Sequence, residues 1–184
     1  MLNLRSKTHF SFFQFRYTDA LATNWERRKA CVAKWNFRCQ CPRCNDPTEF
    51  GTYTSGINCC HCDGGILLVN STDTKWKCQK CPYESSHSEI WISILKPLER
   101  AKQDCISQTA NENVIEQYLW TAQKLLHENH GWILEMEYKL LFLYSKKLKV
   151  MKKGKKPIQL RLVQLGLHLL QVSEHKTVFP NSLP

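Results

Sequence analysis

The second half of the chain carries hydrophobic residues at the spacing of amphipathic helices. From about residue 89 to residue 173, apolar side chains recur at i, i+3, i+4 and i+7, the repeat that lets a helix bury one face. This pattern predicts four helices, over residues 90–105, 113–126, 132–148 and 158–173. Because the connections between them are short, we expect antiparallel helical hairpins stacked side by side, as in a tetratricopeptide-like (TPR-like) domain.

The first 37 residues show two further patterns. Residues 8–18 are rich in aromatic side chains and contain neither Gly nor Pro, which favours a β-strand. Residues 19–37 favour a helix, with Asp19 or Thr23 as the residue that caps its first turn. The apolar face of this helix would consist of Leu21, Trp25, Ala30 and Trp35.

Residues 38–84 contain few apolar positions and many turn-forming residues, so they favour loops and short strands. Such a segment can bury little hydrophobic surface of its own, and we expect metal binding to supply most of its folding free energy. The fold class expected for the whole chain is therefore mostly α, with a small zinc-rich loop and β module. Residues 174–184 favour a frayed tail.

Composition narrows the class of protein. The chain has 184 residues, of which 42% are hydrophobic and 23% charged, which is the composition of a globular protein. No run of about 18 apolar residues occurs, so we expect no membrane-spanning helix. The first residues lack the pattern of a secretory signal, which favours the nucleus or the cytoplasm. In those reducing compartments, the 10 cysteines favour metal sites over disulfides.

The clearest metal motif is a pair of CxxC knuckles. Cys59 and Cys62 are followed, after 15 residues, by Cys78 and Cys81. Each knuckle presents two thiolates on a tight turn, and two knuckles complete the tetrahedral shell that Zn²⁺ prefers. The intervening segment reads as a turn, an apolar strand and a second polar turn, the arrangement of a zinc ribbon.

A second motif, Cys39-x-Cys41-x2-Cys44, offers three soft ligands to a second zinc ion. Three thiolates cannot close a tetrahedron, so a fourth ligand is needed. The nearby candidates are Cys31, Cys60 and His61.

The chain is basic, with a formal charge of +10. Two zinc ions, each held by four thiolates and so contributing about −2, would leave roughly +6. Residues 146–156 contain seven lysines, which favour a solvated connection between helices or, alternatively, a nucleic-acid or nuclear-import patch.

Several of these segments together resemble a known family. The stretch from Tyr17 to Leu21, the pair Arg27-Arg28 and the run from Trp35 to Cys44 resemble the end of a SET domain and its post-SET segment in SMYD protein-lysine methyltransferases. The run from Asp46 to Thr52, with the two CxxC knuckles, is similar to the arthropod SMYD-like branch that includes the msta proteins. Residues 125–130 and 140–144 resemble the helical C-terminal domain of the family.

The resemblance implies a division of the chain. Residues 8–37 would be the end of the SET domain, and residues 38–84 the post-SET and zinc-ribbon module. Residues 89–173 would be the helical C-terminal domain, followed by a tail over residues 174–184.

The resemblance also implies roles for individual residues. Tyr17 matches the catalytic tyrosine that closes the last SET motif, and Phe37 matches an aromatic residue that lines the cofactor and lysine pocket. Cys39, Cys41 and Cys44 match three of the four post-SET zinc ligands. In the family the fourth ligand comes from an Asn-His-Ser-Cys motif, which this sequence does not contain.

A full-length relative is therefore implied to be an S-adenosylmethionine-dependent methyltransferase that modifies lysines of histones or other proteins in chromatin. The 184 residues lack the MYND finger and most of the SET core, so we expect them to be a fragment that is inactive alone. The alternative is a zinc-ribbon and helical scaffold that binds a partner protein in transcriptional regulation. A third interpretation is nucleic-acid binding through residues 146–156.

Overall fold

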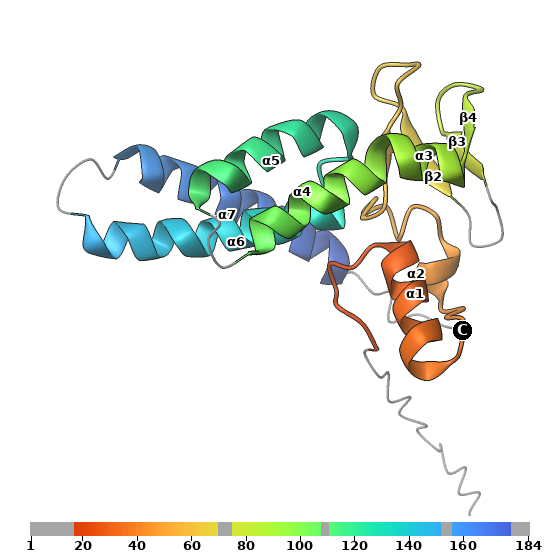
Figure 1. Ribbon diagram of the computed structural model, residues 1–184, viewed down its shortest axis with the longest axis horizontal. Helices are drawn as coiled ribbons and strands as arrows, with labels where there is room; N and C mark the ends of the chain where they lie inside the picture. The colour runs from red at the N-terminus through yellow and green to blue at the C-terminus, as the bar shows by residue number, and fades with distance from the viewer. Residues whose placement is uncertain (1–16, 70–74, 108–110, 152–155, 178–184) are drawn as a thin grey trace, which may run out of the picture.

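A computed structural model describes residues 17–69, 75–107, 111–151 and 156–177, with side chains up to residue 172 (Figure 1). The chain is mostly helical and contains one small sheet. The helices are α1 (Asn24–Trp35), α2 (Pro42–Asn45), α3 (His87–Ile90), α4 (Lys96–Ile106), α5 (Glu112–Leu125), α6 (Gly131–Val150) and α7 (Lys156–Thr177). A π-helical turn, Trp91–Leu95, joins α3 to α4. None of the described helices is long and apolar enough to cross a membrane.

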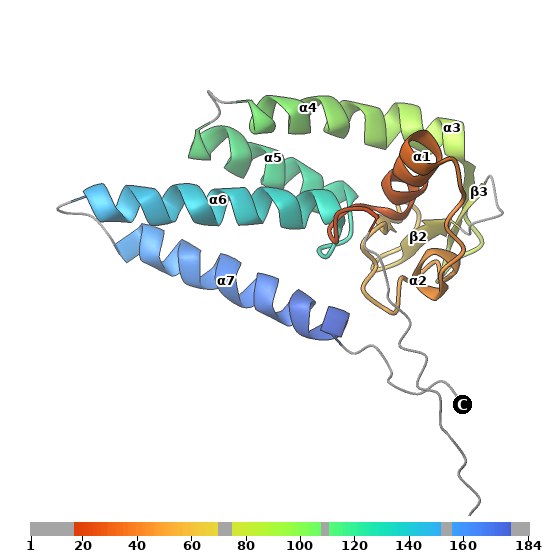
Figure 2. The same ribbon diagram turned by 90° about the horizontal axis from the view of Figure 1, so that it is seen from below.

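The four helices expected from the apolar repeat are present. Helices α4, α5, α6 and α7 lie in chain order, each packed against the next, as Figure 2 shows from below. The first predicted helix corresponds to the continuous run of α3, the π-helical turn and α4. This run begins at His87, earlier than the apolar pattern indicates, because Ser86 and Glu89 form a capping box there. The last two are tied together by His168 on α7, whose Nδ1 lies 2.6 Å from the buried Glu137 carboxylate on α6. Whether the stack is TPR-like stays a prediction.

The sheet has four antiparallel strands in chain order, β1-β2-β3-β4. They are β1 (Ile57–Asn58), β2 (Ile66–Val69), β3 (Lys75–Cys78) and β4 (Glu84–Ser86). The backbone also bridges from Ile57 to Leu126, just beyond α5, and the Asn58 side-chain amide donates to the Leu126 carbonyl at 2.9 Å. The edge of the sheet is thereby attached to the helical stack.

The sheet and the helices share one hydrophobic core. Ile57, Leu67 and Trp76 from the strands are fully buried in the same cluster as the inner faces of α4, α5 and α6. The prediction that residues 38–84 depend mostly on metal binding for folding therefore left out their burial against the helices. The strands bury their few large side chains against the helices, and this burial contributes to folding alongside any metal.

Helix α1 differs from its prediction. Thr23 is the capping residue, in a capping box with Glu26, and the helix begins at Asn24. The predicted apolar face is right only at Trp25, which packs against the core, because the buried residues are Asn24, Arg27 and Cys31, while Trp35 is 55% exposed. Of the predicted strand over residues 8–18, residues 8–16 lie outside the described part, and residues 17 and 18 are not in a strand.

The segment around α1 is attached to the start of α6 by a close backbone approach. The Gly131 N–H donates to the Thr54 carbonyl at 2.9 Å, and a Cβ on Gly131 would lie only 1.9 Å from the Leu21 carbonyl oxygen. Beside it, the Trp132 indole N–H donates to the Glu26 carboxylate at 2.6 Å. His130 caps α6 by accepting from the Trp132 N–H, and burial, with Lys102 and His127 nearby, lowers its pKa to about 3.

We expect Gly131→Ala to destabilise the protein by about 3 kcal/mol, because the added methyl group overlaps the backbone at Leu21. Gly166→Ala on α7 is the matched control. Its Cβ would lie 4.0 Å from Leu141, an ordinary contact, so the better helix propensity of Ala should stabilise the protein by up to about 1 kcal/mol. Chemical unfolding of both variants measures the difference, and equal stabilities would contradict the close approach.

Candidate metal centres

Four cysteines converge at one end of the sheet. The sulfur atoms of Cys59, Cys62, Cys78 and Cys81 all lie within 4.8 Å of one another. Cys59 Sγ is 3.8 Å from Cys81 Sγ, and Cys62 Sγ is 3.6 Å from Cys78 Sγ. Four sulfurs placed about 2.3 Å from a zinc ion at tetrahedral angles are about 3.8 Å apart. The four thiols could therefore hold zinc with little rearrangement.

The two knuckles of this site have the same local geometry. Cys59 follows β1 and Cys78 ends β3, and each sulfur accepts a backbone N–H from two residues further on. The donors are His61 and Lys80, both with N···S distances of 3.4 Å. Such N–H groups stabilise the negative charge of thiolates, which is the form that binds metal.

The thiol pKa values diverge because the four groups share protons. Desolvation opposes ionisation of Cys78, but the backbone N–H groups of Lys80 and Cys81 outweigh it and lower the Cys78 pKa to about 6. Desolvation and hydrogen bonds with the other three thiols raise the pKa of Cys62 to about 12. A divalent cation at the centre would replace those protons, so metal affinity should fall as the pH falls.

Gly65 makes room for the four sulfurs. A Cβ at this position would lie 2.4 Å from Cys62 Sγ and 2.7 Å from Cys78 Sγ. The Gly65 carbonyl meanwhile accepts the Cys59 N–H at 2.9 Å, which fixes the first knuckle to the start of β2. Only glycine allows the backbone to pass this close to the thiols.

The second cysteine cluster consists of Cys39 and Cys41, which precede α2, and Cys44, which lies in α2. The sulfurs of Cys39, Cys41 and Cys44 lie within 4.8 Å of one another, and Cys44 is buried. Two side chains of α1 hold this knuckle, because Asn24 and Arg28 both donate to the Cys44 carbonyl, at 3.0 and 2.7 Å. These three thiols could also hold zinc, as part of its shell.

A buried group of charged side chains lies next to Cys44 of the second cluster. The Glu49 carboxylate, which is fully buried, lies 2.6 Å from the Arg27 guanidinium and 3.2 Å from that of Arg43. Burial opposes the charge of Arg27, but Glu49 and the nearby Cys44 thiol outweigh it and raise the Arg27 pKa. Glu49 and Phe50 have positive φ angles, of 53° and 63°, so the backbone adopts a left-handed conformation where the buried carboxylate is attached.

Two of the three candidates for a fourth ligand lie elsewhere. The His61 ring stacks on Tyr83 with centroids 4.0 Å apart, and Cys60 interacts with the Tyr83 hydroxyl. Both are exposed and lie beside the four-cysteine site. Cys31 is buried on α1, close enough for the Cys44 and Cys41 thiols to influence its pKa.

Tyr17 and Phe37 lie in contact. Their ring centroids are 5.1 Å apart in an edge-to-face arrangement, and Tyr17 contacts Trp35 in the same way at 5.7 Å. Tyr17 is 47% exposed and Trp35 is 55% exposed, so the aromatic group lies open on the surface. The catalytic and cofactor-binding roles of Tyr17 and Phe37 stay predictions.

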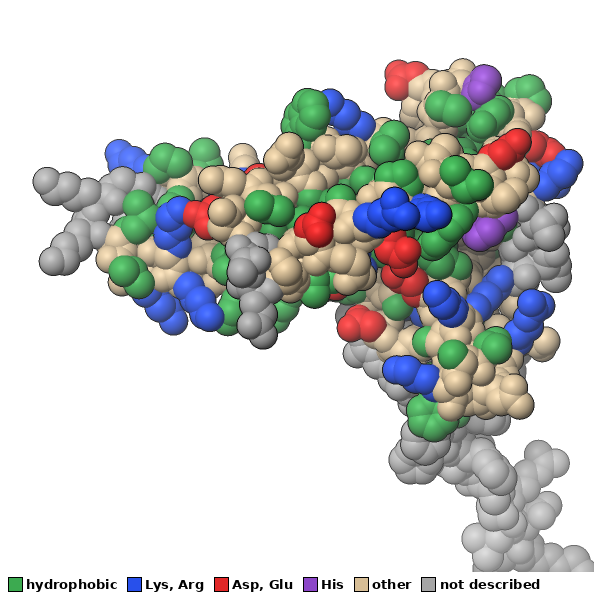
Figure 3. Space-filling view, viewed as in Figure 1, with side chains coloured by type: hydrophobic (Ala, Val, Ile, Leu, Met, Phe, Trp, Pro, Cys, Tyr) green, Lys and Arg blue, Asp and Glu red, His purple; other side chains and the backbone are tan. Residues whose placement is uncertain are grey.

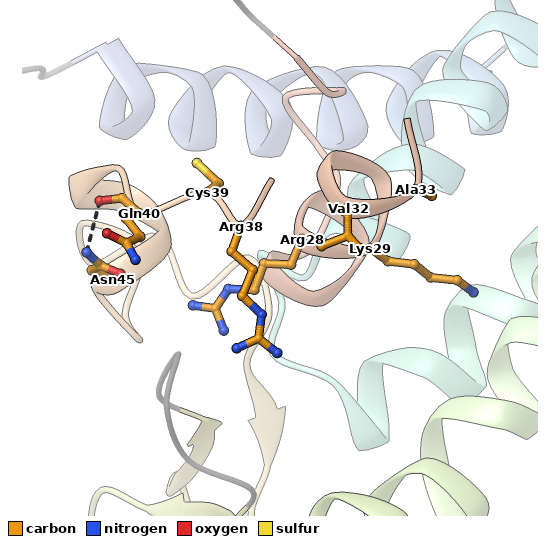
Figure 4. A pocket seen from close by; sticks show the side chains of 8 residues that line it. All are labelled: Arg28, Lys29, Val32, Ala33, Arg38, Cys39, Gln40 and Asn45. Atoms are coloured by element: carbon orange, nitrogen blue, oxygen red, sulfur yellow. Dashed lines mark hydrogen bonds between the residues drawn. The ribbon is translucent and has the colours of Figure 1, made fainter. Parts of the chain in front are cut away.

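A basic hollow of about 720 Å³ lies beside the second cysteine cluster. It is lined by Arg28, Lys29, Val32, Ala33, Arg38, Cys39, Gln40 and Asn45. Figure 4 shows the guanidinium groups of Arg28 and Arg38 close together, while the Cys39 thiol points the other way. Figure 3 shows basic side chains gathered over the α1 part of the molecule, at the lower right.

Three contributors to these sites were missed by reasoning from the sequence. Gly65 was visible only as part of a turn signal, because its closeness to the thiols depends on how the two knuckles meet. Arg27 and Glu49 form an ion pair across 22 positions of sequence, and nothing in either local pattern links them. Arg27 and the run from Asp46 to Thr52 were each part of the family resemblance, but that resemblance gave no reason to pair Arg27 with Glu49.

Comparison with known proteins shows that part of this chain is distantly similar to a SET domain-containing protein. Isoform B of the SET domain-containing protein SmydA-8 of Drosophila melanogaster is 36% identical over 59 residues, which cover 30% of this chain and 13% of that protein. Isoform A is 32% identical over 78 residues, which cover 40% of this chain and 17% of that protein. No protein-family model matches the chain.

The matched stretches span less than a fifth of the length of either relative. The similarity links the chain to SET-domain proteins of the SMYD-like kind, and only loosely. Together with the two cysteine clusters, which could hold zinc, it agrees with the resemblance only at the level of a loose SET-domain relationship.

We expect Gly65→Ala to abolish tight zinc binding at the four-cysteine site, because the methyl group would occupy space between the sulfurs. Zinc content after dialysis against a chelator should fall by one ion per chain. Gly51→Ala is the control. Gly51 also has a positive φ, of 73°, but its Cβ would meet nothing within 4 Å, so this variant should lose some stability and no zinc. Full zinc retention by Gly65→Ala would refute the assignment.

Proposed function

We propose that this chain is the post-SET and C-terminal region of a SMYD-like SET-domain protein. In its full-length form, that protein would transfer methyl groups from S-adenosylmethionine to lysines of histones or other proteins. The observation that carries the proposal is the position of Phe37, in contact with Tyr17 and two residues before the first thiol of the Cys39, Cys41 and Cys44 cluster. The distant similarity to SmydA-8 supports it.

In this proposal the second zinc ion has a positioning role. A zinc ion bound by Cys39 would restrain the chain at that residue and so limit the movement of Phe37. The Phe37 ring would cover one wall of the cofactor and lysine pocket, and the Tyr17 hydroxyl would orient the lysine amine. S-adenosylmethionine, when bound, would supply the methyl group.

The zinc ribbon would have a structural role. It places Ile57, Leu67 and Trp76 against the helical stack, which supports a fixed orientation between the post-SET segment and the helices. Thiolate ligands persist in a reducing compartment, which agrees with action in the nucleus or the cytoplasm.

A second candidate function is a scaffold that binds a partner protein in transcriptional regulation. It is favoured by the exposed aromatic residues of α6, since Tyr138 is 66% exposed and Phe142 is 53% exposed. With Ile106 of α4 they line a shallow hollow of about 400 Å³. Apolar side chains left exposed together are typical of protein interaction sites.

Under either function, the 184-residue chain should have no methyltransferase activity alone. We expect it neither to bind S-adenosylmethionine at micromolar concentration nor to methylate histones, because the chain lacks the glycine-rich donor loop of the family. Isothermal titration with the cofactor and a labelled-methyl transfer assay measure both.

The decisive test of the methyl-transfer proposal joins this region to the front part of the SET core of a SmydA-8-type protein, ending just before the residue that corresponds to Tyr17, so that Tyr17 is the tyrosine of the joined domain. The chimaera should transfer label, and Tyr17→Phe should reduce the rate by at least about 100-fold, the usual size of a lost catalytic hydroxyl. Tyr138→Phe, which removes a hydroxyl far from the proposed pocket, is the control. A chimaera that folds, binds zinc and transfers label equally well with Tyr17→Phe would refute the assignment of Tyr17.

A further inference from the structure

Helix α7 exposes an apolar face at the edge of the helical stack. Its main partner among the described elements is α6, and Leu165 of α7 lies in the shared hydrophobic core (Figure 2). The other side of α7 carries four large apolar side chains, each between 56% and 63% exposed, which we call the α7 stripe. They are Leu160, Val163, Leu167 and Leu170.

The spacing of the α7 stripe is that of a helix-pairing seam. Its members follow one another at steps of three, four and three residues, which is the alternation of the inner positions in a two-stranded coiled coil. Side chains at this spacing lie in a nearly straight line along a helix, so a second helix laid alongside can bury all of them. A contiguous exposed row of this kind is typical of an interaction surface.

The outer face of α7 is uncharged, although the chain as a whole carries a formal charge of +10. The ionisable side chains within the described residues 157–172 are Arg161 and His168, and both are bound inside the stack. Arg161 binds the Glu116 carboxylate of α5 at 2.9 Å through two nitrogens, and His168 lies 2.6 Å from Glu137 of α6. The exposed residues that flank the stripe are glutamines, at positions 159, 164 and 171. Two copies of this basic chain can therefore meet along α7 without repulsion between like charges.

We propose that the α7 stripe is the surface through which two copies of this chain pair, with their α7 helices antiparallel. A two-fold axis would pass near Leu165, so that Leu160 lies beside Leu170 of the second copy and Val163 beside Leu167. The inference concerns self-association and stands apart from methyl transfer.

The ends of α7 carry opposite charges in line with the stripe. The same spacing leads back to Lys156, the first residue of the helix, and forward to Glu174 in its last turn. An antiparallel pair would bring position 156 of each copy beside position 174 of the other. A parallel pair would instead bring lysine to lysine and glutamate to glutamate, so the charges favour the antiparallel arrangement.

The position of the segment around α1 favours the same arrangement. His168 Nε2 lies 3.3 Å from the Asn129 side-chain oxygen, just before the point where Gly131 meets Leu21. The second half of α7 therefore lies at the end of the stack that carries the basic α1 segment. A parallel pair would place the two basic segments side by side, whereas an antiparallel pair places them at opposite ends.

The stripe makes a small interface. From position 156 to position 174 it is about 27 Å long, at a rise of 1.5 Å per residue. Interfaces of one helix against another belong to the small and weak class, so we expect a dissociation constant on the order of 10 µM. Pairing would then depend on the concentration of the protein.

Sedimentation of the zinc-loaded chain over about 1 to 200 µM tests the proposal, since this range spans the expected dissociation constant. The wild-type chain should change from monomer to dimer, and Leu167→Glu should stay monomeric because it buries a charge in the seam. Tyr138→Glu changes an apolar side chain of α6 that is 66% exposed, and this matched control should dimerise as the wild type does. Circular dichroism and zinc content show whether each variant is folded.

Three results would overturn the inference. A wild-type chain that is monomeric throughout this range would show that a different occupant covers the stripe. A dimer that persists in Leu167→Glu, or one that is lost in Tyr138→Glu, would show that the copies meet through another surface.

Exchange of the end charges tests the orientation of the two helices. Lys156→Glu and Glu174→Lys should each raise the dissociation constant by at least about 3-fold, because the symmetry of the pair repeats each lost contact twice. The double variant Lys156→Glu/Glu174→Lys restores opposite charges across an antiparallel pair and should return to the wild-type value. A double variant that pairs no better than the single ones would refute the antiparallel arrangement.

Discussion

The rest of the structure depends on the closure of the small sheet by the thiols of Cys59, Cys62, Cys78 and Cys81. Strands of two to four residues make too few hydrogen bonds to form a stable sheet by themselves. The thiols bring the connection between β1 and β2 and the connection between β3 and β4 to one point, and Gly65 lets the backbone pass beside the sulfurs. Loss of this closure would release the inner face of the sheet, on which one end of the helical stack rests.

Two contacts transmit that constraint through the molecule. Trp76 lies at the centre of the sheet and packs edge-to-face with Trp25 of α1, which in turn packs against Trp132 of α6. The Glu26 carboxylate joins the same junction by capping α1 and accepting the Trp132 indole N–H. The sheet, α1 and the start of α6 therefore share one aromatic junction, so the orientation of α1 relative to the stack depends on the sheet.

The sequence allowed the periodic and the closely spaced features to be predicted. The helices α4 to α7 follow from an apolar repeat, and the two cysteine clusters follow from spacings of one and two residues. The polar part of the buried face of α1 could not be predicted in this way, because Arg27 packs against a loop that presents Glu49 rather than against an apolar surface. Helical periodicity identifies a buried face only when burial is hydrophobic, and here an ion pair and a thiol are buried instead.

Sequence separation also differs sharply between the two halves of the core. Helices α4, α5, α6 and α7 each pack against their immediate neighbour in the chain, so their contacts are local and can form rapidly. The sheet contacts the neighbouring α3, but its inner face also needs distant partners, since Ile57 bridges to Leu126 and Trp76 packs against Trp25. During synthesis the sheet emerges before the helices that cover it. Its strands must therefore wait for the later residues, and early capture of zinc by the four thiols would protect their exposed edges from aggregation in the interval.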